Sequence, residues 1–201
     1  MKNIFNLEIH NDSLDAKITA GFERLSQVFR VLLWENAKNN DLSPIQIQLL
    51  IFIKYHSANK ATVSYLAKEF NLTKATISDS IRVLEQRKYI IKVPHSQDSR
   101  SSTISLTLEG IQAVHLTENF INPVYDIIAS TPENDKIILW RNITSLIQQL
   151  NHLQLISAQN SCSMCGYFQQ ENDINYCRLL QIRLKTDDIR LDCADHKPVR
   201  L

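Results

Sequence analysis

The chain has 201 residues, of which 44% are hydrophobic and 21% are charged, and its formal net charge is +1. This composition is ordinary for a soluble globular protein with one compact domain and a small accessory module. The low net charge excludes a protein that coats nucleic acid by its overall charge alone. No apolar run has the length of a membrane span. We expect a cytoplasmic protein that does not contact a membrane, because the first residues, MKNIFNLEIHND, lack a signal-peptide core.

Helical periodicity begins near the N-terminus. Apolar residues recur at spacings of three and four over residues 14–39, which predicts a long amphipathic helix. A second helix should begin at Ser43-Pro44, because serine is a good N-cap and proline is favoured in the first helical turn. The following sequence, IQIQLLIFIKYH, is apolar almost all round and therefore predicts a buried, central helix.

Two shorter helices and a hairpin should follow. Thr62 and Thr73 are expected to cap helices over residues 62–70 and 74–89, with a short turn at Asn71-Leu72 between them. The apolar period then changes to about two residues, which predicts strands at 89–93 and 102–106 and a polar loop, PHSQDSRS, between them. Two short helices joined by a tight turn and followed by a hairpin make a winged helix-turn-helix.

The chain after the hairpin is again helical. Thr107 should cap a helix that continues through Phe120, is interrupted near Asn122-Pro123 and resumes to about residue 130. A last long helix is expected from Glu133 to about residue 156. The fold class that these patterns predict is mainly α, with a small β-hairpin as the wing.

Positive charge is concentrated around the predicted helix-turn-helix and hairpin. Residues 60–105 carry eight Lys or Arg and four Asp or Glu, so this segment has a charge of +4 and the rest of the chain −3. A local basic segment on a nearly neutral chain is typical of a small DNA-reading module. On charge alone, a basic face that contacts only solvent is the alternative.

The helix that begins after Thr73 presents a face suited to DNA. If Ile77, Ile81 and Leu84 face the core, the opposite face carries small hydrogen-bonding side chains and one arginine. Thr73 and Lys74 lie at the positive N-terminal end of the helix, where a phosphate would bind. The other candidate DNA-binding residues on this helix are Ala75, Thr76, Ser78, Asp79 and Arg82.

The segment NLTKATISDSIRVLEQRKYIIKVPHSQDSRSSTISLTLEG resembles the core of the MarR family of transcriptional regulators. In that family the wing has an Asp-x-Arg motif followed by Leu-Thr-x-x-Gly, which correspond here to Asp98-Ser99-Arg100 and to residues 106–110. The resemblance extends over the helical layout of about residues 12–156. It implies that Arg100 reaches into the minor groove while Asp98 orients its guanidinium. Ser101, the next residue, joins these two as a candidate DNA-binding residue.

The resemblance also implies a homodimer formed through the first and last helices. These helices carry wider apolar stripes than one small winged helix could cover, which agrees with a dimer; packing within a single chain is the alternative. In a two-fold dimer, two recognition helices contact half-sites about one helical turn apart on double-stranded DNA.

All four cysteines lie near the C-terminus, as Cys162-Ser-Met-Cys165, then Cys177 and Cys193. In a reducing compartment, such clustering favours metal or redox chemistry over disulfides. Two cysteines with two residues between them can hold one ion from a tight turn, and the two distant cysteines complete a set of four thiolate ligands. We expect Zn²⁺, with an iron–sulfur cluster as the alternative because it uses the same thiolates. Asp192 and His196 are more often neighbours of such ligands than ligands themselves.

These expectations divide the chain into four parts: an N-terminal dimerisation helix (1–42), a winged helix-turn-helix (43–107), C-terminal dimerisation helices (108–157) and a four-cysteine metal-binding module (158–201). We expect a transcriptional regulator that binds double-stranded DNA sequence-specifically, with activity or stability dependent on the metal centre. An enzyme is not expected, because no phosphate loop, nucleophile elbow or paired carboxylates occur. The alternatives are a regulator with purely structural zinc that responds to a small-molecule effector, and a winged-helix protein–protein adaptor.

Overall fold

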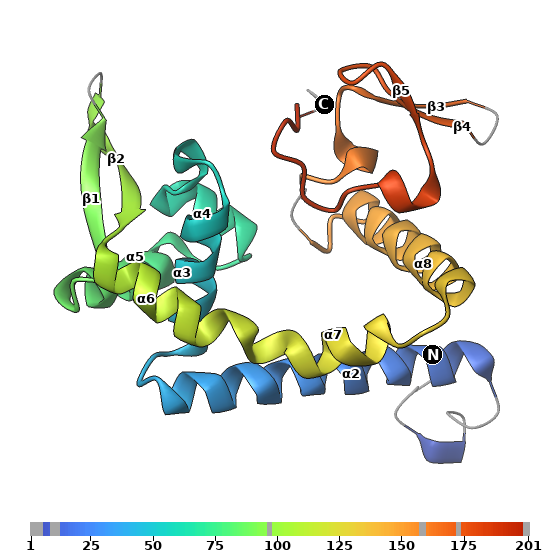
Figure 1. Cartoon of the computed structure of the whole chain (residues 1–201), viewed down its shortest axis with the longest axis horizontal. Coiled ribbons are helices and arrows are strands. Elements are labelled where there is room, and N and C mark those ends of the chain that lie inside the picture. The colour runs from blue at the N-terminus through green and yellow to red at the C-terminus, as the bar shows by residue number, and fades with distance from the viewer. Residues whose placement is uncertain (1–5, 9–12, 96–97, 157–159, 172–173, 199–201) are drawn as a thin grey trace.

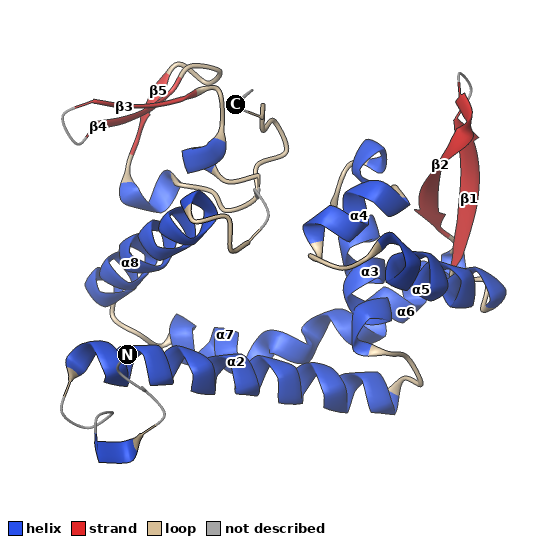
Figure 2. Cartoon of the chain, turned by 180° about the vertical axis from the view of Figure 1, so that it is seen from behind, coloured by secondary structure: helices blue, strands red, loops and turns tan. Residues whose placement is uncertain are grey.

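The computed structural model describes residues 6–8, 13–95, 98–156, 160–171 and 174–198, with the backbone alone at residues 95 and 98–101. Two lobes face each other across a base made by two long helical segments (Figure 1). One lobe contains α3 (Pro44–Tyr55) to α6 (Leu108–Thr117) and the hairpin of β1 (Ile90–His95) and β2 (Asp98–Leu106), and the other contains α8 (Glu133–His152) and the C-terminal strands (Figure 2). The base is formed by α2 (Leu14–Asn39) and by the run that continues from α6 into α7 (Asn122–Ala129). The observed class, mainly helical with a small hairpin, confirms the predicted fold class.

The first two predicted helices have the predicted beginnings. Helix α2 spans Leu14–Asn39 and α3 spans Pro44–Tyr55. Ser43 and Gln46 form a capping box: Ser43 Oγ accepts from the Gln46 amide at 3.3 Å, and Gln46 Oε1 accepts from the Ser43 amide at 2.8 Å. Ile47, Leu49 and Leu50 of α3 are completely buried. Helix α3 is therefore the central helix of its lobe, as its nearly all-apolar sequence predicts.

The helix-turn-helix consists of α4 (Val63–Glu69) and α5 (Lys74–Gln86). Thr62 caps α4 and Thr73 caps α5, each by accepting a backbone N–H three residues later. Helix α5 is three residues shorter than predicted, because Lys88 takes a left-handed conformation with φ of 60°. The Tyr89 amide then bonds to the Leu84 carbonyl, which ends the helix.

The wing is an antiparallel pair, β1 (Ile90–His95) and β2 (Asp98–Leu106), and it is longer than predicted. The expected loop over residues 94–101 was wrong, because β2 already begins at Asp98 and only residues 96–97 lie outside the described part. Polar side chains do not prevent pairing in a ribbon exposed to solvent, since the backbone supplies the ladder. At its base the hairpin is fixed by Ile90 and Ile104, which are buried, and by a bond from the Ile104 amide to the Ala61 carbonyl.

The helices after the wing are α6 (Leu108–Thr117), α7 (Asn122–Ala129) and α8 (Glu133–His152). The interruption predicted near Asn122-Pro123 instead lies at a 3₁₀ turn, η2 (Glu118–Ile121). Pro123 belongs to the first turn of α7, where a missing N–H costs nothing. Helix α8 ends four residues before the predicted end, and Gln154 just beyond it has a φ of 58°.

The C-terminal module contains a three-stranded antiparallel sheet in the order β3–β4–β5, for which the sequence analysis predicted no strands. Its strands are Phe168–Glu171, Ile174–Cys177 and Ile182–Leu184, flanked by the 3₁₀ turns η3 (Cys162–Met164) and η4 (Thr186–Asp188). Most of its described side chains are half-buried or exposed, so the sheet has little core of its own.

The large buried apolar residues belong mainly to the winged-helix lobe, where α3, α4, α5, the hairpin and α6 meet. No helix in the described ranges combines the length and the hydropathy that crossing a membrane requires.

Gly110, the glycine of the Leu-Thr-x-x-Gly motif, lies against the chain that leads into the wing. A Cβ at this position would be 1.9 Å from the Tyr89 carbonyl oxygen, which itself accepts the Thr107 amide at 3.0 Å. We predict that Gly110→Ala lowers the free energy of unfolding by about 1–3 kcal/mol, as overpacking does, measured by urea denaturation. Gly21→Ala is the matched control, because no atom lies within 4 Å of that Cβ. The control should stabilise the protein slightly, and equal effects of the two changes would contradict the prediction.

Candidate nucleic-acid interface and four-cysteine site

Helix α5 divides into a buried face and an exposed face. Ile77, Ile81 and Leu84 are at most 1% exposed. Every candidate residue of the opposite face, together with its N-terminal end, is exposed: Thr73, Lys74, Ala75, Thr76, Ser78, Asp79 and Arg82. The packing of these three apolar residues thus leaves all the candidate residues of α5 exposed to solvent. That these residues bind DNA stays a prediction.

Two side-chain contacts organise this exposed face. Thr73 Oγ1 accepts the Thr76 amide at 3.1 Å and lies 2.9 Å from the Thr76 hydroxyl. Arg82 donates to Asp79 Oδ1 at 2.8 Å, an exposed pair one turn apart on the helix. Such a pair contributes little to stability, about 0–1 kcal/mol, so its carboxylate can be exchanged for another acceptor at low cost. The guanidinium keeps further N–H donors for a base edge or a phosphate.

The predicted basic segment is partly neutralised by ion pairs. Arg87 pairs with Asp41, Lys92 with Glu85 and Lys60 with Asp192, in addition to the Arg82 pair. Within the described residues, three exposed cations of this segment have no carboxylate partner: Lys68, Lys74 and Lys88. The charge available to a polyanion is therefore smaller than the sequence count indicates, and it lies at the ends of α4 and α5.

The wing residues are placed only as backbone. Asp98, Arg100 and Ser101 belong to strand β2, and their side chains lie outside the described part of the chain. Figure 1 shows the hairpin extending away from the helices of its lobe. The minor-groove role of Arg100 and the orienting role of Asp98 remain predictions.

All four cysteines line one small cavity of about 30 Å³ in the C-terminal module, together with Asp195 and with apolar and aromatic side chains. They form no disulfide and each is half-buried. Cys162 and Cys165 lie at the two ends of the η3 turn, where the Cys165 amide donates to the Cys162 carbonyl at 3.0 Å. Backbone amides also donate to two of the sulfurs, from Arg190 to Cys162 Sγ at 3.2 Å and from Lys197 to Cys165 Sγ at 3.5 Å.

The four thiols have the right chemistry to bind a cation, but they are not arranged as a metal site in this structure. Burial raises the pKa of Cys162, the Arg190 amide acts in the opposite direction, and the three other cysteines raise it further. Four ionisable thiols crowded in an apolar cavity favour ionisation only with a cation that neutralises them. Among the described residues, no group of three or more Cys, His, Asp or Glu is already arranged to hold a metal ion.

Asp192 and His196, the acidic and the imidazole side chain near the cysteines in the sequence, contact other parts of the chain. His196 Nε2 donates to the Met164 carbonyl, 3.0 Å away, and so supports the backbone of the η3 turn. Asp192 faces the other lobe, where it contacts His56 and Lys60. Neither residue lines the cysteine cavity.

A larger, polar cavity of about 530 Å³ lies between α8 and the C-terminal module. Arg141 and Arg190 contribute to its wall, as does Asn175, whose buried side-chain oxygen has no hydrogen-bond partner among the described residues. Its lining does not resemble the apolar pocket that a hydrophobic effector would need.

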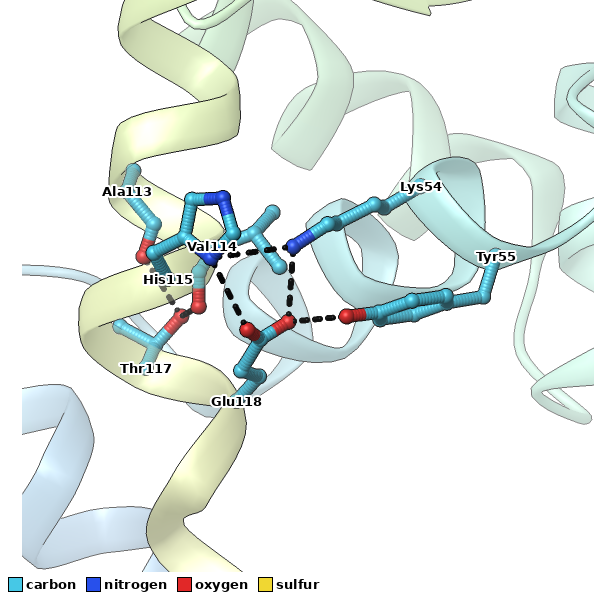
Figure 3. Close-up of polar contacts among 7 residues, drawn as sticks. All are labelled: Lys54, Tyr55, Ala113, Val114, His115, Thr117 and Glu118. Atoms are coloured by element: carbon cyan, nitrogen blue, oxygen red, sulfur yellow. Dashed lines mark hydrogen bonds and ion pairs between the residues drawn. The ribbon is translucent and has the colours of Figure 1, made fainter.

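A charged cluster that sequence analysis did not predict joins the end of α3 to η2 (Figure 3). Glu118 Oε2 accepts from Lys54 Nζ at 3.0 Å and from Tyr55 Oη at 2.5 Å, and Glu118 Oε1 lies 3.1 Å from His115 Nδ1. Hydrogen bonds from Tyr55 and Lys54 lower the pKa of Glu118 to about 2. No sequence signal indicates it, because α3 and η2 are far apart in the chain and share no repeat.

The capped helix pair, the exposed face of α5 and the hairpin define a winged helix-turn-helix protein. Residues 40–101 match the family model described as "MarR family", so this part of the chain is similar to the winged-helix domain of that family.

Solved structures give the same fold. FabT of Streptococcus pneumoniae in complex with DNA is 26% identical, with a TM-score of 0.55 over 68% of this chain and 99% of FabT. MepR of S. aureus is 24% identical in its DNA complex, with a TM-score of 0.58 over 66% of this chain and 97% of MepR. MepR in its DNA-binding conformation is 22% identical, with a TM-score of 0.59. These proteins are covered almost completely, so about a third of this chain has no counterpart in them. No curated protein matches the sequence.

The Glu118 cluster generates a prediction about pH. A carboxyl whose pKa is lowered on folding contributes stability above its unfolded pKa and loses that contribution as pH falls towards the folded pKa. We predict that Glu118→Gln lowers the free energy of unfolding at pH 7, measured by urea denaturation, and that the difference from the wild type shrinks between about pH 4.5 and pH 2. Glu109→Gln, an exposed acid of α6, should show no such pattern. A difference that is constant over this range would contradict the prediction.

Proposed function

We propose that this protein is a homodimeric transcriptional regulator that binds double-stranded DNA sequence-specifically through α5 and the wing, and that its four cysteines hold a metal centre. The observation that carries the proposal is the exposed face of α5, with small hydroxyl and polar groups and one arginine on a helix locked by its buried face. The MarR-family match of residues 40–101, and the fold shared with FabT and MepR, which were solved with DNA, support it.

Charge and helix geometry support the same binding mode. Lys74 lies in the first turn of α5, where the helix dipole and unpaired amides favour a phosphate. Lys68 and Lys88 are exposed at the ends of α4 and α5 and would neutralise neighbouring phosphates. Phosphate contacts of this kind set the register, while Ser78 and Arg82, both exposed on the helix, would contact base edges.

The dimer is supported by apolar side chains outside the winged-helix core. Large apolar residues on three helices are at least 39% exposed, and ten of those named below belong to α2 and α7. Such an apolar surface on a soluble protein is typical of a subunit interface. The residues are Ile18, Phe22, Leu25, Val28, Phe29, Val31 and Trp34 of α2, Tyr125, Ile127 and Ile128 of α7, and Ile138, Leu139, Leu146 and Leu150 of α8.

The metal centre is supported by the shared cavity of Cys162, Cys165, Cys177 and Cys193 and by the amide bonds to two of the sulfurs. A zinc ion, or an iron–sulfur cluster as the alternative, would neutralise the thiolates and add folding energy to a sheet too small for a core. A regulator with purely structural zinc that responds to a small-molecule effector remains the second reading of the module.

The DNA-binding proposal is tested on a duplex that the wild-type protein selects from a random library. We predict that Arg82→Ala costs about 1–3 kcal/mol, roughly 5- to 150-fold in Kd, and relaxes base preference. Lys74→Ala should weaken binding to all sequences equally and reduce the salt slope by about 1. Both are measured by fluorescence anisotropy at several salt concentrations.

Lys136→Ala removes one positive charge from α8 and serves as the control, with an expected Kd near that of the wild type. If neither variant changes affinity and binding shows no steep salt dependence, the winged helix acts as a protein–protein adaptor instead.

The metal proposal is tested by elemental analysis and an ultraviolet–visible spectrum of anaerobically purified protein. We predict one zinc per chain and a colourless solution, and that Cys177→Ser and Cys193→Ser each lose the metal. Visible absorbance that disappears in air would replace zinc by the iron–sulfur cluster. Protein that folds fully without any metal or cluster, with unchanged behaviour of both variants, would overturn the metal centre.

A further inference from the structure

Two residues of the four-cysteine module contact the helix-turn-helix directly. Asn160 Nδ2 donates to the Tyr65 hydroxyl of α4 at 2.9 Å. Asp192 Oδ2 contacts His56 Nε2 at the end of α3, and its other oxygen lies 3.8 Å from Lys60 Nζ. These contacts join the two lobes that face each other in Figure 1.

On the module side, both residues are tied to cysteines. Asp192 immediately precedes Cys193, and the Cys193 amide donates to the Asn160 carbonyl at 2.9 Å. Asn160 is two residues before Cys162, whose amide donates to the Arg190 carbonyl, also at 2.9 Å. Segments 160–162 and 190–193 are therefore held side by side, so the positions of the Cys162 and Cys193 sulfurs and of the two contacting side chains depend on each other.

On the helix-turn-helix side, the contacted residues belong to an aromatic cluster. The His56 ring stacks on Phe52 with centroids 3.7 Å apart, and Phe52 also contacts Tyr65 and Phe70 at 6.1 and 5.8 Å. This cluster joins the end of α3 to both ends of α4. The completely buried Leu66 of α4 belongs to the same core as Ile77 and Ile81 of α5. A displacement of Tyr65 or His56 is therefore passed through this shared core to α5, the helix that carries the candidate DNA-binding face.

We propose that Asn160 and Asp192 are positioning residues that transmit the loading of the four-cysteine centre to the recognition helix α5. With Cys162 and Cys193 held on one metal, Asn160 and Asp192 are held against Tyr65 and His56, and α4 is fixed relative to α3. Without the metal, the 160–162 and 190–193 segments lose this constraint and the contacts with α3 and α4 weaken. The inference rests on the proposed metal centre and DNA binding, and it assigns the residues that couple them.

The test compares Zn²⁺-reconstituted and EDTA-stripped full-length protein, with Kd measured on the selected duplex and hydrogen exchange measured over α3 and α4. In the wild type, zinc should change Kd by about 5- to 150-fold and increase amide protection at residues 56–70. Asp192→Ala and Asn160→Ala should each bring the ratio of the two Kd values close to one and remove the added protection, while zinc content stays at one per chain.

Matched variants separate coupling from general stability. Asp187→Ala removes the same charge from the exposed η4 turn of the module and should leave the wild-type ratio intact. Asp192→Glu should restore part of the ratio. Tyr65→Phe removes only the hydroxyl that Asn160 contacts, so combining it with Asn160→Ala should add no further loss, as a double-mutant cycle requires for directly interacting groups.

Each way in which the proposed function or the coupling could fail gives a different experimental result. Absence of zinc binding, or of DNA binding in both states, overturns the proposed function. Normal zinc and DNA binding with a zinc-dependent Kd that Asp192→Ala and Asn160→Ala leave unchanged overturns only the coupling role of these residues. A zinc-independent Kd in the wild type, with zinc bound, also overturns the coupling and leaves a structural zinc.

Discussion

The burial of one face of α5 in the core of its lobe determines which side chains the protein offers to its surroundings. Burying Ile77, Ile81 and Leu84 stabilises the fold by about 1.5–3 kcal/mol for each side chain. A rotation of the helix by one residue would expose Ile77 and force the Ser78 hydroxyl into an apolar core without a partner. The orientation of the candidate DNA-binding face is therefore set by hydrophobic packing on the opposite side, and the polar face needs no contacts of its own to stay in place.

The end of α3 is the point at which the other parts of the chain attach to the winged helix. Three consecutive residues there bind two distant partners: Lys54 and Tyr55 bind Glu118 of η2, and His56 binds Asp192 of the cysteine module. The first attachment fixes the helices that lead to the proposed dimer surface, and the second fixes the module.

The C-terminal module differs from the rest of the chain in how it can be stabilised. The winged-helix lobe has a continuous apolar core, whereas the module has a small cavity lined by the four thiols, Asp195 and five apolar or aromatic side chains. A sheet of this size gains too little from burial to offset its loss of conformational entropy, so the proposed metal, held by the four thiolates, would supply what a core cannot. In the proposed function, this dependence is what makes the module sensitive to its ligand.

The sequence by itself determined the features that depend on a few neighbouring residues. The threonine and serine caps and the apolar period of α2 to α5 act within one or two turns of the chain, and each is visible in the residues concerned. The approach of Gly110 to the Tyr89 carbonyl joins residues 21 positions apart and was seen only in the tertiary structure. The sequence did not determine the length of the wing, because polar residues suit a loop and an exposed ribbon equally well. The spacing of the cysteines predicted that they act together, but not that two amides point at their sulfurs. Only the tertiary structure brought Glu118 to Lys54 and Asp192 to His56, because such pairs are selected by how distant helices pack, and charged residues on a helix surface carry no local sign of their partners.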